Sequence, residues 1–115
     1  MNNEMETMIM NLIVDAGSAR SYAMDAIRLA KEGCIEEAEA SLDNSDADIG
    51  MAHRGQTDLI HNEAKGVHTE MSLFMVHAQD HIMTAILARD LAREFVDLYK
   101  TLRKDGYDHE NHFQR

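Results

Sequence analysis

The chain has 115 residues, one cysteine and a formal net charge of −10, and its length predicts a single domain with its own core. Because phosphate binding requires clustered lysine and arginine, the acidic excess argues against a nucleic-acid partner. There is no run of about 18 apolar residues and no basic segment typical of a signal peptide at the start, so we expect a cytoplasmic protein without direct membrane insertion.

Three similar signals predict where helices end. The segments "LAKEG", "NEAKG" and "LRKDG" each place a lysine just before a glycine, at Gly33, Gly66 and Gly106. A lysine complements the dipole in the last turn, and glycine adopts the left-handed conformation that commonly ends a helix. The sequence therefore predicts one all-α domain over residues 1–105 and a loosely ordered tail over residues 106–115. The predicted helices span about residues 3–32, 35–65 and 68–104.

The first two predicted helices each carry one apolar stripe with alternating spacings of three and four residues. This pattern is typical of coiled-coil-like packing and predicts an antiparallel three-helix bundle with long helices. The first stripe comprises Met5, Met8, Leu12, Ala16 (or Asp15), Ala19, Ala23, Ile27 and Ala30. The second comprises Ile35, Ala38, Leu42, Ser45, Ile49, Ala52, Gln56 and Leu59.

The third predicted helix differs because it carries two neighbouring bands. The first band comprises Phe74, Ala78, His81, Ala85, Ala88, Ala92, Phe95 and Tyr99. The second comprises Leu73, Val76, His77, Asp80, Met83, Leu87 and Leu91. A helix apolar over so much of its circumference is buried on two sides. We expect the first band to face the other helices and the second to face further copies of the chain.

The stretch "VHAQDHIMT" at residues 76–84 places ionisable side chains inside this helix. At helical spacing His77 neighbours Asp80 and His81, whereas Gln79 points nearly the opposite way. One hypothesis is a buried polar cluster whose members satisfy one another in a non-catalytic helical-bundle adaptor. Burying such groups is costly unless they are paired, so a functional site is a competing hypothesis.

Two metal sites are disfavoured by the pattern. A metalloprotease H-E-x-x-H motif requires a glutamate where Ala78 stands, and the chain has no Glu-x-x-His pair for a di-iron bundle.

A further hypothesis makes one histidine a nucleophile that accepts a phosphoryl group. Backbone amides in mid-helix are already bonded, so side chains, either His81 or residues of another subunit, must hold the phosphate oxygens.

The segment "SLFMVHAQDHIMTAILARDLAREFVDLY" resembles the C-terminal helix of the lactose/cellobiose-type enzyme IIA of the bacterial phosphoenolpyruvate-dependent sugar phosphotransferase system. The family hallmark, V-H-A-Q-D-H-L-M-T, is matched from Val76 to Thr84 with Ile82 in place of leucine. The segments "IVDAGSARSYAMDAIRLAKEG" and "AEASLDNSDADIGMAHRGQTDLIHNEA" resemble the family's first and second helices. The resemblance ends at about residue 105.

The resemblance implies a homotrimeric phosphocarrier. It implies that the histidine phosphocarrier protein phosphorylates His77, forming a tele-phosphohistidine intermediate. The phosphoryl group then passes to a cysteine of the cognate enzyme IIB during disaccharide uptake of the lactose, cellobiose or chitobiose type. Gln79 and His81 would support the site in a crevice between subunits. We expect Leu73, Met75 and Met83 to form the docking surface for both partners.

The resemblance also implies a metal ion on the trimer axis, held by Asp80 from each of three subunits. Three converging carboxylates repel one another and must take up protons or a cation. Mg²⁺ or another divalent ion, one per trimer, suits such a ring of oxygen ligands. The identity of the sugar is left open, because the IIA component does not contact it.

Overall fold

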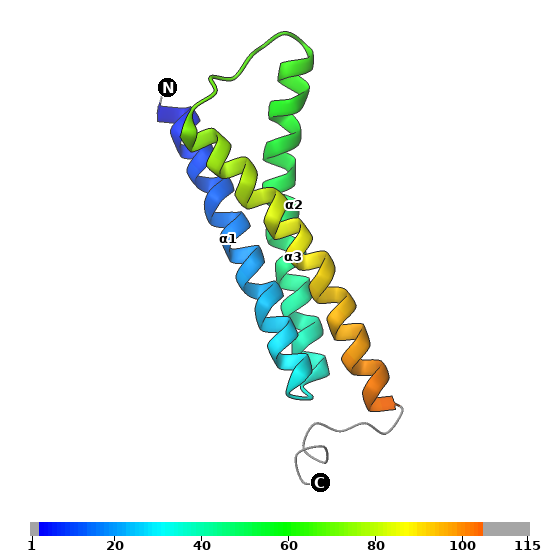
Figure 1. Ribbon diagram of the computed structural model, residues 1–115. Helices are drawn as coiled ribbons and strands as arrows, with labels where there is room; N and C mark the ends of the chain where they lie inside the picture. The colour runs from blue at the N-terminus through cyan, green and yellow to red at the C-terminus, as the bar shows by residue number, and fades with distance from the viewer. Residues whose placement is uncertain (1–2, 105–115) are drawn as a thin grey trace.

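The computed structural model describes residues 3–104, which form three helices: α1 (Asn3–Lys31), α2 (Ile35–Ala64) and α3 (Leu73–Lys104). Figure 1 shows that α1 runs down the molecule, α2 returns and α3 runs down again, so that α1 and α3 are parallel to each other. The principal extents are 61 × 21 × 19 Å, and the described residues include no strand. The predicted all-α three-helix bundle is confirmed.

Two of the predicted glycine stops are confirmed. Gly33 has a φ of 91° and Gly66 a φ of 88°, and both follow a helix. The amide of Cys34 donates to the Leu29 carbonyl at 2.8 Å, and the amide after Gly66 makes the equivalent bond to Asn62 at 2.8 Å. These are Schellman motifs, which satisfy carbonyls that the helix end leaves unpaired. Gly106 and the predicted tail lie outside the described residues.

The predicted start of the third helix at residue 68 is wrong, because α3 begins at Leu73. Residues 67–72 have no regular structure and connect α2 to α3. The Met75 amide donates to the Ser72 hydroxyl at 3.1 Å, so Ser72 is the N-cap of α3. The connecting residues bury little, with Val67 60% and Met71 74% exposed, and no core contact holds them in a helical turn.

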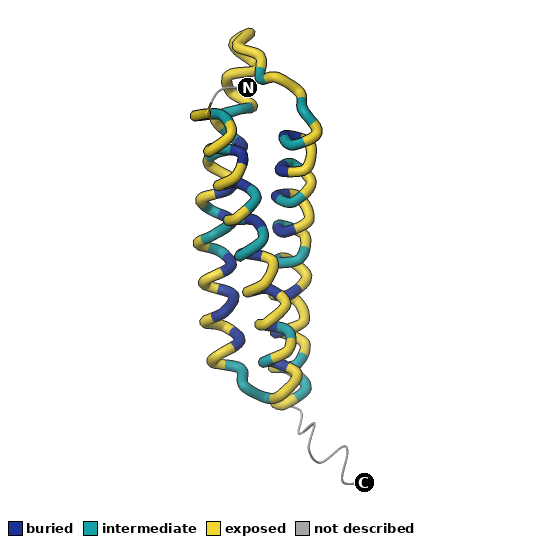
Figure 2. The backbone as a smooth tube through the Cα atoms, turned by 90° about the vertical axis from the view of Figure 1, so that its left-hand side faces the viewer, coloured by how far each residue is buried: buried dark blue, intermediate teal, exposed yellow. Residues whose placement is uncertain are grey.

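The core lies along the inner faces of the three helices and is built largely from small residues (Figure 2). Most members of the two predicted stripes on α1 and α2 are buried, including the polar Ser45 and Gln56. The Ser45 hydroxyl donates to the Ala19 carbonyl at 2.7 Å, so its burial across the α1–α2 interface is compensated. Gly55 allows close packing, because an added Cβ would lie 2.8 Å from Leu12 Cδ2. The fully buried alanines, at 2% exposure or less, are Ala16, Ala19, Ala23, Ala26, Ala30, Ala38, Ala52, Ala78, Ala85 and Ala92.

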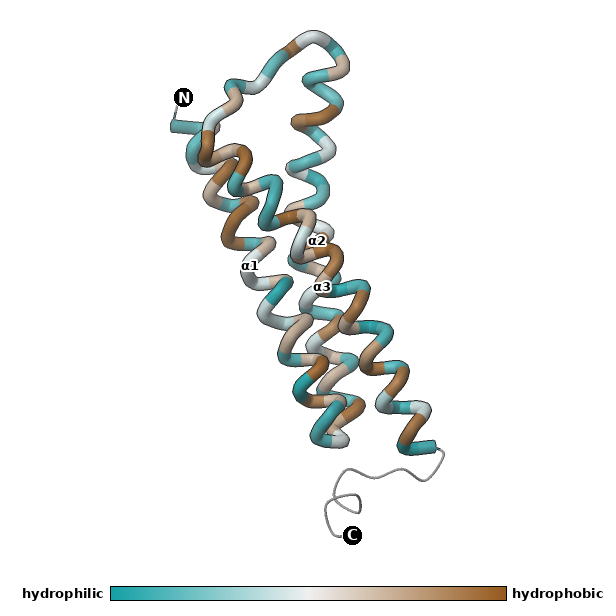
Figure 3. The backbone as a smooth tube through the Cα atoms, viewed as in Figure 1, coloured by the Kyte–Doolittle hydropathy of each residue, from teal (hydrophilic) through white to brown (hydrophobic). Residues whose placement is uncertain are grey.

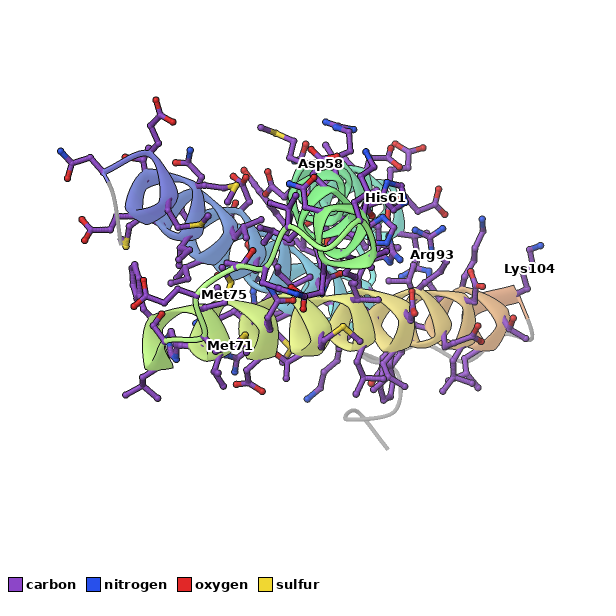
Figure 4. All side chains as sticks on the ribbon, turned by 90° about the horizontal axis from the view of Figure 1, so that it is seen from above. Asp58, His61, Met71, Met75, Arg93 and Lys104 are labelled. Carbon is purple, nitrogen blue, oxygen red and sulfur yellow. The ribbon has the colours of Figure 1, made fainter. Side chains whose placement is uncertain are left out.

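Ion pairs join α2 to the C-terminal half of α3. Asp46 accepts from Arg89 at 3.0 Å and from Arg93 at 2.8 Å, and Glu39 accepts from Lys100 at 3.0 Å. Figure 4 shows Arg93 on α3, away from the N-terminal end of the helix. The N-terminal half of α3, which carries the candidate site, has no ion pair of this kind to α2 among the described residues.

The second band of α3 is left uncovered by its own chain. Figure 4 shows side chains of α3 projecting on the side away from α1 and α2, and the hydropathy view in Figure 3 shows apolar positions recurring along α3. Val76, Met83, Leu87 and Leu91 are between 49% and 58% exposed, and Leu73 is 85% exposed. The placement of Phe95 in the inward band is wrong, since it is 43% exposed.

Within residues 3–104, no helix has an apolar stretch of the length that a membrane span requires.

Candidate functional site

The two histidines of residues 76–84 lie side by side on α3. The ring centroids of His77 and His81 are 4.2 Å apart, with the ring planes inclined at 47°. His77 is exposed, whereas His81 is half-buried. Because α3 continues without a break through both residues, the helix fixes their spacing and the ring contact limits how far either imidazole can turn. The predicted neighbouring pair is confirmed, and the exposed ring is accessible to another molecule.

Asp80 lies on the same exposed side of α3 as His77. No hydrogen bond or ion pair with residues 3–104 engages its carboxylate. The described residues contain no group of three or more histidine, cysteine, aspartate or glutamate side chains able to hold a metal ion. A metal at Asp80 would therefore need ligands from outside the described part of this chain. A carboxylate without a partner suits a hard, oxygen-preferring cation.

Gln79 points toward α2, away from the histidine pair. Its Oε1 accepts a hydrogen bond from Gln56 Nε2 at 2.8 Å, and its own Nε2 makes a weak 3.6 Å contact to Met75 Sδ. The predicted divergence of Gln79 from His77 is thus observed. Gln56 is only 8% exposed and occupies the Gln79 Oε1, so that the Gln79 NH₂ group makes only the weak contact to Met75 Sδ.

The role of Gln56 was missed by the sequence reasoning, which treated it as a polar interruption of the α2 stripe. A buried glutamine in an apolar stripe needs a hydrogen-bond partner, and that requirement was the available signal. The pattern alone did not show that the partner lay on α3.

A cleft of about 580 Å³ adjoins the histidine pair, between α1 and α3. His81 and Thr84 line it from α3. The residues that line it from α1 are Ala16, Gly17, Arg20, Ser21, Met24 and Asp25. The sequence reasoning assigned no function to these α1 residues, because they lie beside the apolar stripe of that helix and carry no metal-ligand or nucleophile spacing.

The predicted docking surface is corrected in one residue. Met75 is 3% exposed and belongs to the core, whereas Leu73 and Met83 are 85% and 57% exposed. Figure 4 marks Met75 close to the N-terminal end of α3. Met75 therefore supports the helix from within, and the exposed apolar surface near His77 is formed by its neighbours.

The burial of the side chains bears on the hypothesis of a buried polar cluster. That hypothesis requires His77, Asp80 and His81 to satisfy one another inside the core. In the single chain His77 and Asp80 are exposed, so water can solvate both. The geometry instead presents an imidazole at the surface, in contact with a second imidazole and followed by a carboxylate that has no partner among residues 3–104.

A bundle of long helices with an accessible histidine pair is the architecture of this chain. Its sequence is similar to the phosphotransferase components called enzyme IIA. The chain belongs to the family described as the lactose/cellobiose-specific IIA subunit of the sugar phosphotransferase system, whose sequence pattern matches residues 7–100. The chain is 48% identical over 102 residues to the lichenan-specific phosphotransferase enzyme IIA component of Bacillus subtilis, covering 89% of this chain and 93% of that one.

Two solved structures share the fold. The cellobiose-specific enzyme IIA from Bacillus anthracis is 44% identical with a TM-score of 0.85, and the match covers 90% of this chain and 95% of that chain. The IIA component in the solution structure of the IIA(Chitobiose)–HPr complex from Escherichia coli is 40% identical with a TM-score of 0.75, covering 89% and 99%. These values confirm the family resemblance and the bundle.

Proposed function

We propose that this IIA component is a cytoplasmic phosphocarrier that accepts a phosphoryl group from the histidine phosphocarrier protein on His77 and passes it to a cysteine of a cognate enzyme IIB. The observation that carries the proposal is the accessible His77 ring in contact with His81 at 4.2 Å. Relatives named as specific for lichenan, cellobiose and chitobiose support uptake of a disaccharide of the lactose, cellobiose or chitobiose type. The chitobiose relative solved in complex with HPr supports the donor.

In the accepting step, Nε2 of His77 attacks phosphorus as the nitrogen–phosphorus bond of the donor breaks. The donor imidazole takes up a proton as the His77 ring gives one up, so the charges balance. The contact with His81 limits how far the His77 ring can turn, which contributes orientation. Because little covalent chemistry is required beyond this exchange, position and charge balance account for the rate. The onward step exchanges the nitrogen–phosphorus bond for a bond to the IIB cysteine sulfur.

Gln79 would contribute an amide N–H to the site of a neighbouring subunit. Its Oε1 is already occupied by Gln56, so the NH₂ end is available as a hydrogen-bond donor. Because Gln79 diverges from His77 of its own chain, a phosphoryl group within its reach belongs to another copy. This geometry supports a site shared between protomers.

The assembly we propose is a homotrimer whose seam is the outer band of α3, defined as Leu73, Val76, His77, Asp80, Met83, Leu87 and Leu91. Five of its seven members are exposed apolar residues, and their burial supplies the driving force. The unpaired Asp80 of each chain would hold one divalent cation per trimer. When bound, this ion would neutralise three converging carboxylates.

Phosphorylation of the chain tests the carrier proposal. Incubation with phosphoenolpyruvate and the general phosphotransferase proteins should give an acid-labile mass gain of one phosphoryl group per chain. We expect His77→Ala to lose this gain and His53→Ala, which removes an exposed histidine on α2, to retain it. An undiminished gain in His77→Ala would refute the assignment.

The metal proposal has a separate test. Mass analysis of the purified assembly should give about one divalent ion for every three chains. Asp80→Leu should remain trimeric without metal, because an apolar side chain removes the repulsion and keeps the seam filled. Dissociation of this variant into single chains, measured by sedimentation, would count against an axial position for Asp80.

A further inference from the structure

The cleft between α1 and α3 begins where the histidine pair ends. His81 belongs to both features, since its ring contacts His77 and also lines the cleft. The Thr84 hydroxyl donates to the carbonyls of Asp80 and His81 at 2.9 and 3.2 Å, so its proton is already engaged. The remaining hydrogen-bond donors on the α1 wall are Arg20 and Ser21, and the carboxylate on this wall, Asp25, is paired with Arg28 at 3.3 Å.

Arg20 differs from the arginines that stabilise the fold. Arg28 binds Asp25 and Glu32 on α1, and Arg89 and Arg93 bind Asp46 across helices. Arg20 has no hydrogen bond or ion pair with any residue in the part of the chain that the structure describes. A guanidinium with no polar partner in residues 3–104, beside a cleft in a chain of net charge −10, is available to bind an anion.

α1 and α3 run in the same direction (Figure 1), and Arg20 of α1 lines the same cleft as His81 of α3. At 1.5 Å per residue, His77 lies about 6 Å from His81 toward the N-terminus of α3. Gly17 lies about 4.5 Å from Arg20 toward the N-terminus of α1, which is the same direction in space. Helical side chains lean toward the N-terminus, so Arg20 leans over Gly17 toward the level of His77. A Cβ added at Gly17 would meet no atom within 4 Å, so this path is open.

We propose that the cleft is a phosphoryl subsite in which Arg20 binds the non-bridging oxygens of the group carried on His77, with Ser21 as a second donor. The proposal rests on the proposed function and adds no covalent step. A guanidinium matches phosphate oxygens with paired N–H donors and stays charged at cellular pH. It supplies in the same chain the side-chain donors that a mid-helix phosphohistidine lacks from its own backbone.

The test compares Arg20→Gln with Arg54→Gln, which removes an exposed, unpaired arginine from α2. The phosphorylated histidine phosphocarrier protein serves as donor, and rapid-quench kinetics give the transfer rate. We expect Arg20→Gln to slow transfer about tenfold or more, as loss of one charged donor to a reacting group does. Arg54→Gln should transfer at the wild-type rate. The phosphorus NMR signal of the phosphohistidine should shift only in Arg20→Gln.

A second variant tests whether access to the cleft matters when the charge of Arg20 is kept. Gly17→Leu should fold stably, because a Cβ at residue 17 meets no atom within 4 Å and leucine favours the helix, yet the longer side chain obstructs Arg20 and should slow transfer in the same way. Equal rates in the wild type and Arg20→Gln would overturn the subsite and leave the carrier proposal intact. Equal slowing in Arg54→Gln would replace the subsite with general attraction of the donor. A wild type that takes no phosphoryl group would refute the proposed function itself.

Discussion

The two faces of α3 are both apolar, yet only one is covered within the chain. On the inner face, Ile82, Ala85, Ala92 and Val96 are at most 1% exposed, packed against the alanine-rich faces of α1 and α2. On the outer band, members such as Leu87 are more than half exposed. The inner residues are mostly small and allow close helix approach, whereas the outer ones are larger.

The residues with chemical function follow the same division. His77 and Asp80 lie on the outer band, and His81 and Gln79 lie at its margins, turned toward α1 and α2 respectively. The inner face is closed by packing and offers no access to a partner. The outer band combines exposed apolar surface with His77 and Asp80, so in the proposed trimer the contacts that cover the surface would also complete the site.

The largest expected effect comes from a charge placed in the outer band. Leu87→Asp should convert the assembly to single chains, because three added carboxylates would meet in a seam that already holds Asp80. Sedimentation velocity measures the change. Met51→Asp on α2 is the control, since Met51 is 53% exposed against 58% for Leu87 and lies on another helix. An unchanged oligomer in Leu87→Asp would mean that the outer band is not the seam.

The next effect contrasts adjacent residues on the two faces. Ile82 is 1% exposed and Met83 is 57% exposed. Ile82→Ala should destabilise the fold by about 2–5 kcal/mol, because it leaves a cavity between three helices. Met83→Ala should lower the unfolding free energy by less, as measured by urea titration, and should mainly weaken the association of the chains. The measurement uses a protein concentration at which the wild type is dissociated, so that only the fold of the single chain contributes. Equal losses of unfolding free energy in Ile82→Ala and Met83→Ala would contradict the difference between the two faces.

A smaller effect is expected at the glutamine pair beneath the site. Gln56→Met keeps the volume of the side chain but removes the N–H that orients Gln79. The fold should lose about 1 kcal/mol, the value of one hydrogen bond, while phosphoryl transfer falls severalfold. Gln56→Glu should also slow transfer, because a carboxylate would accept from the Gln79 NH₂ group and reverse the amide. Normal transfer in both variants would show that Gln79 orientation does not matter.

Much of the fold was predictable because it depends on local and periodic signals. The stripes on α1 and α2 and the stops at Gly33 and Gly66 depend on residues close together in the sequence. The predicted start of α3 was wrong because the sequence was expected to resume a helix directly after the stop at Gly66, whereas α3 begins at Leu73. The competing signal was the N-cap at Ser72, and in that connection nothing is buried that would favour a helix.

The site was predictable only where helical spacing defines it. The contact of His77 with His81 follows from a separation of four residues. The pairing of Gln56 with Gln79 and the cleft beside Arg20 depend on how three helices are aligned, which periodicity does not specify. The exposure of the outer band could be predicted from the sequence, because α3 has more apolar positions around its circumference than two neighbouring helices can cover.

The smallest expected effect concerns Asp15 on α1, an acid whose environment is set within one chain, unlike Asp80. Burial, and secondarily the charge of Asp48, raise the pKa of Asp15 above its ordinary value. The Ser18 hydroxyl donates to Asp48 at 2.5 Å, whereas Asp15 has no such donor among the described residues. A raised pKa in the folded state means that ionised Asp15 destabilises the fold at neutral pH and that this penalty disappears as the pH falls below the unfolded value.

Asp15→Asn should therefore raise the Tm at pH 7 by about 1–2 °C, the scale of a partly screened charge interaction in a domain of this size. The difference from the wild type should close below about pH 4, where the carboxyl is protonated in both states. Asp58→Asn, at an exposed position on α2, is the control and should leave the Tm unchanged at both pH values. An equal gain at pH 7 and pH 4 would show that ionisation of Asp15 is not the cause, because only the charged form meets the cost of burial beside Asp48.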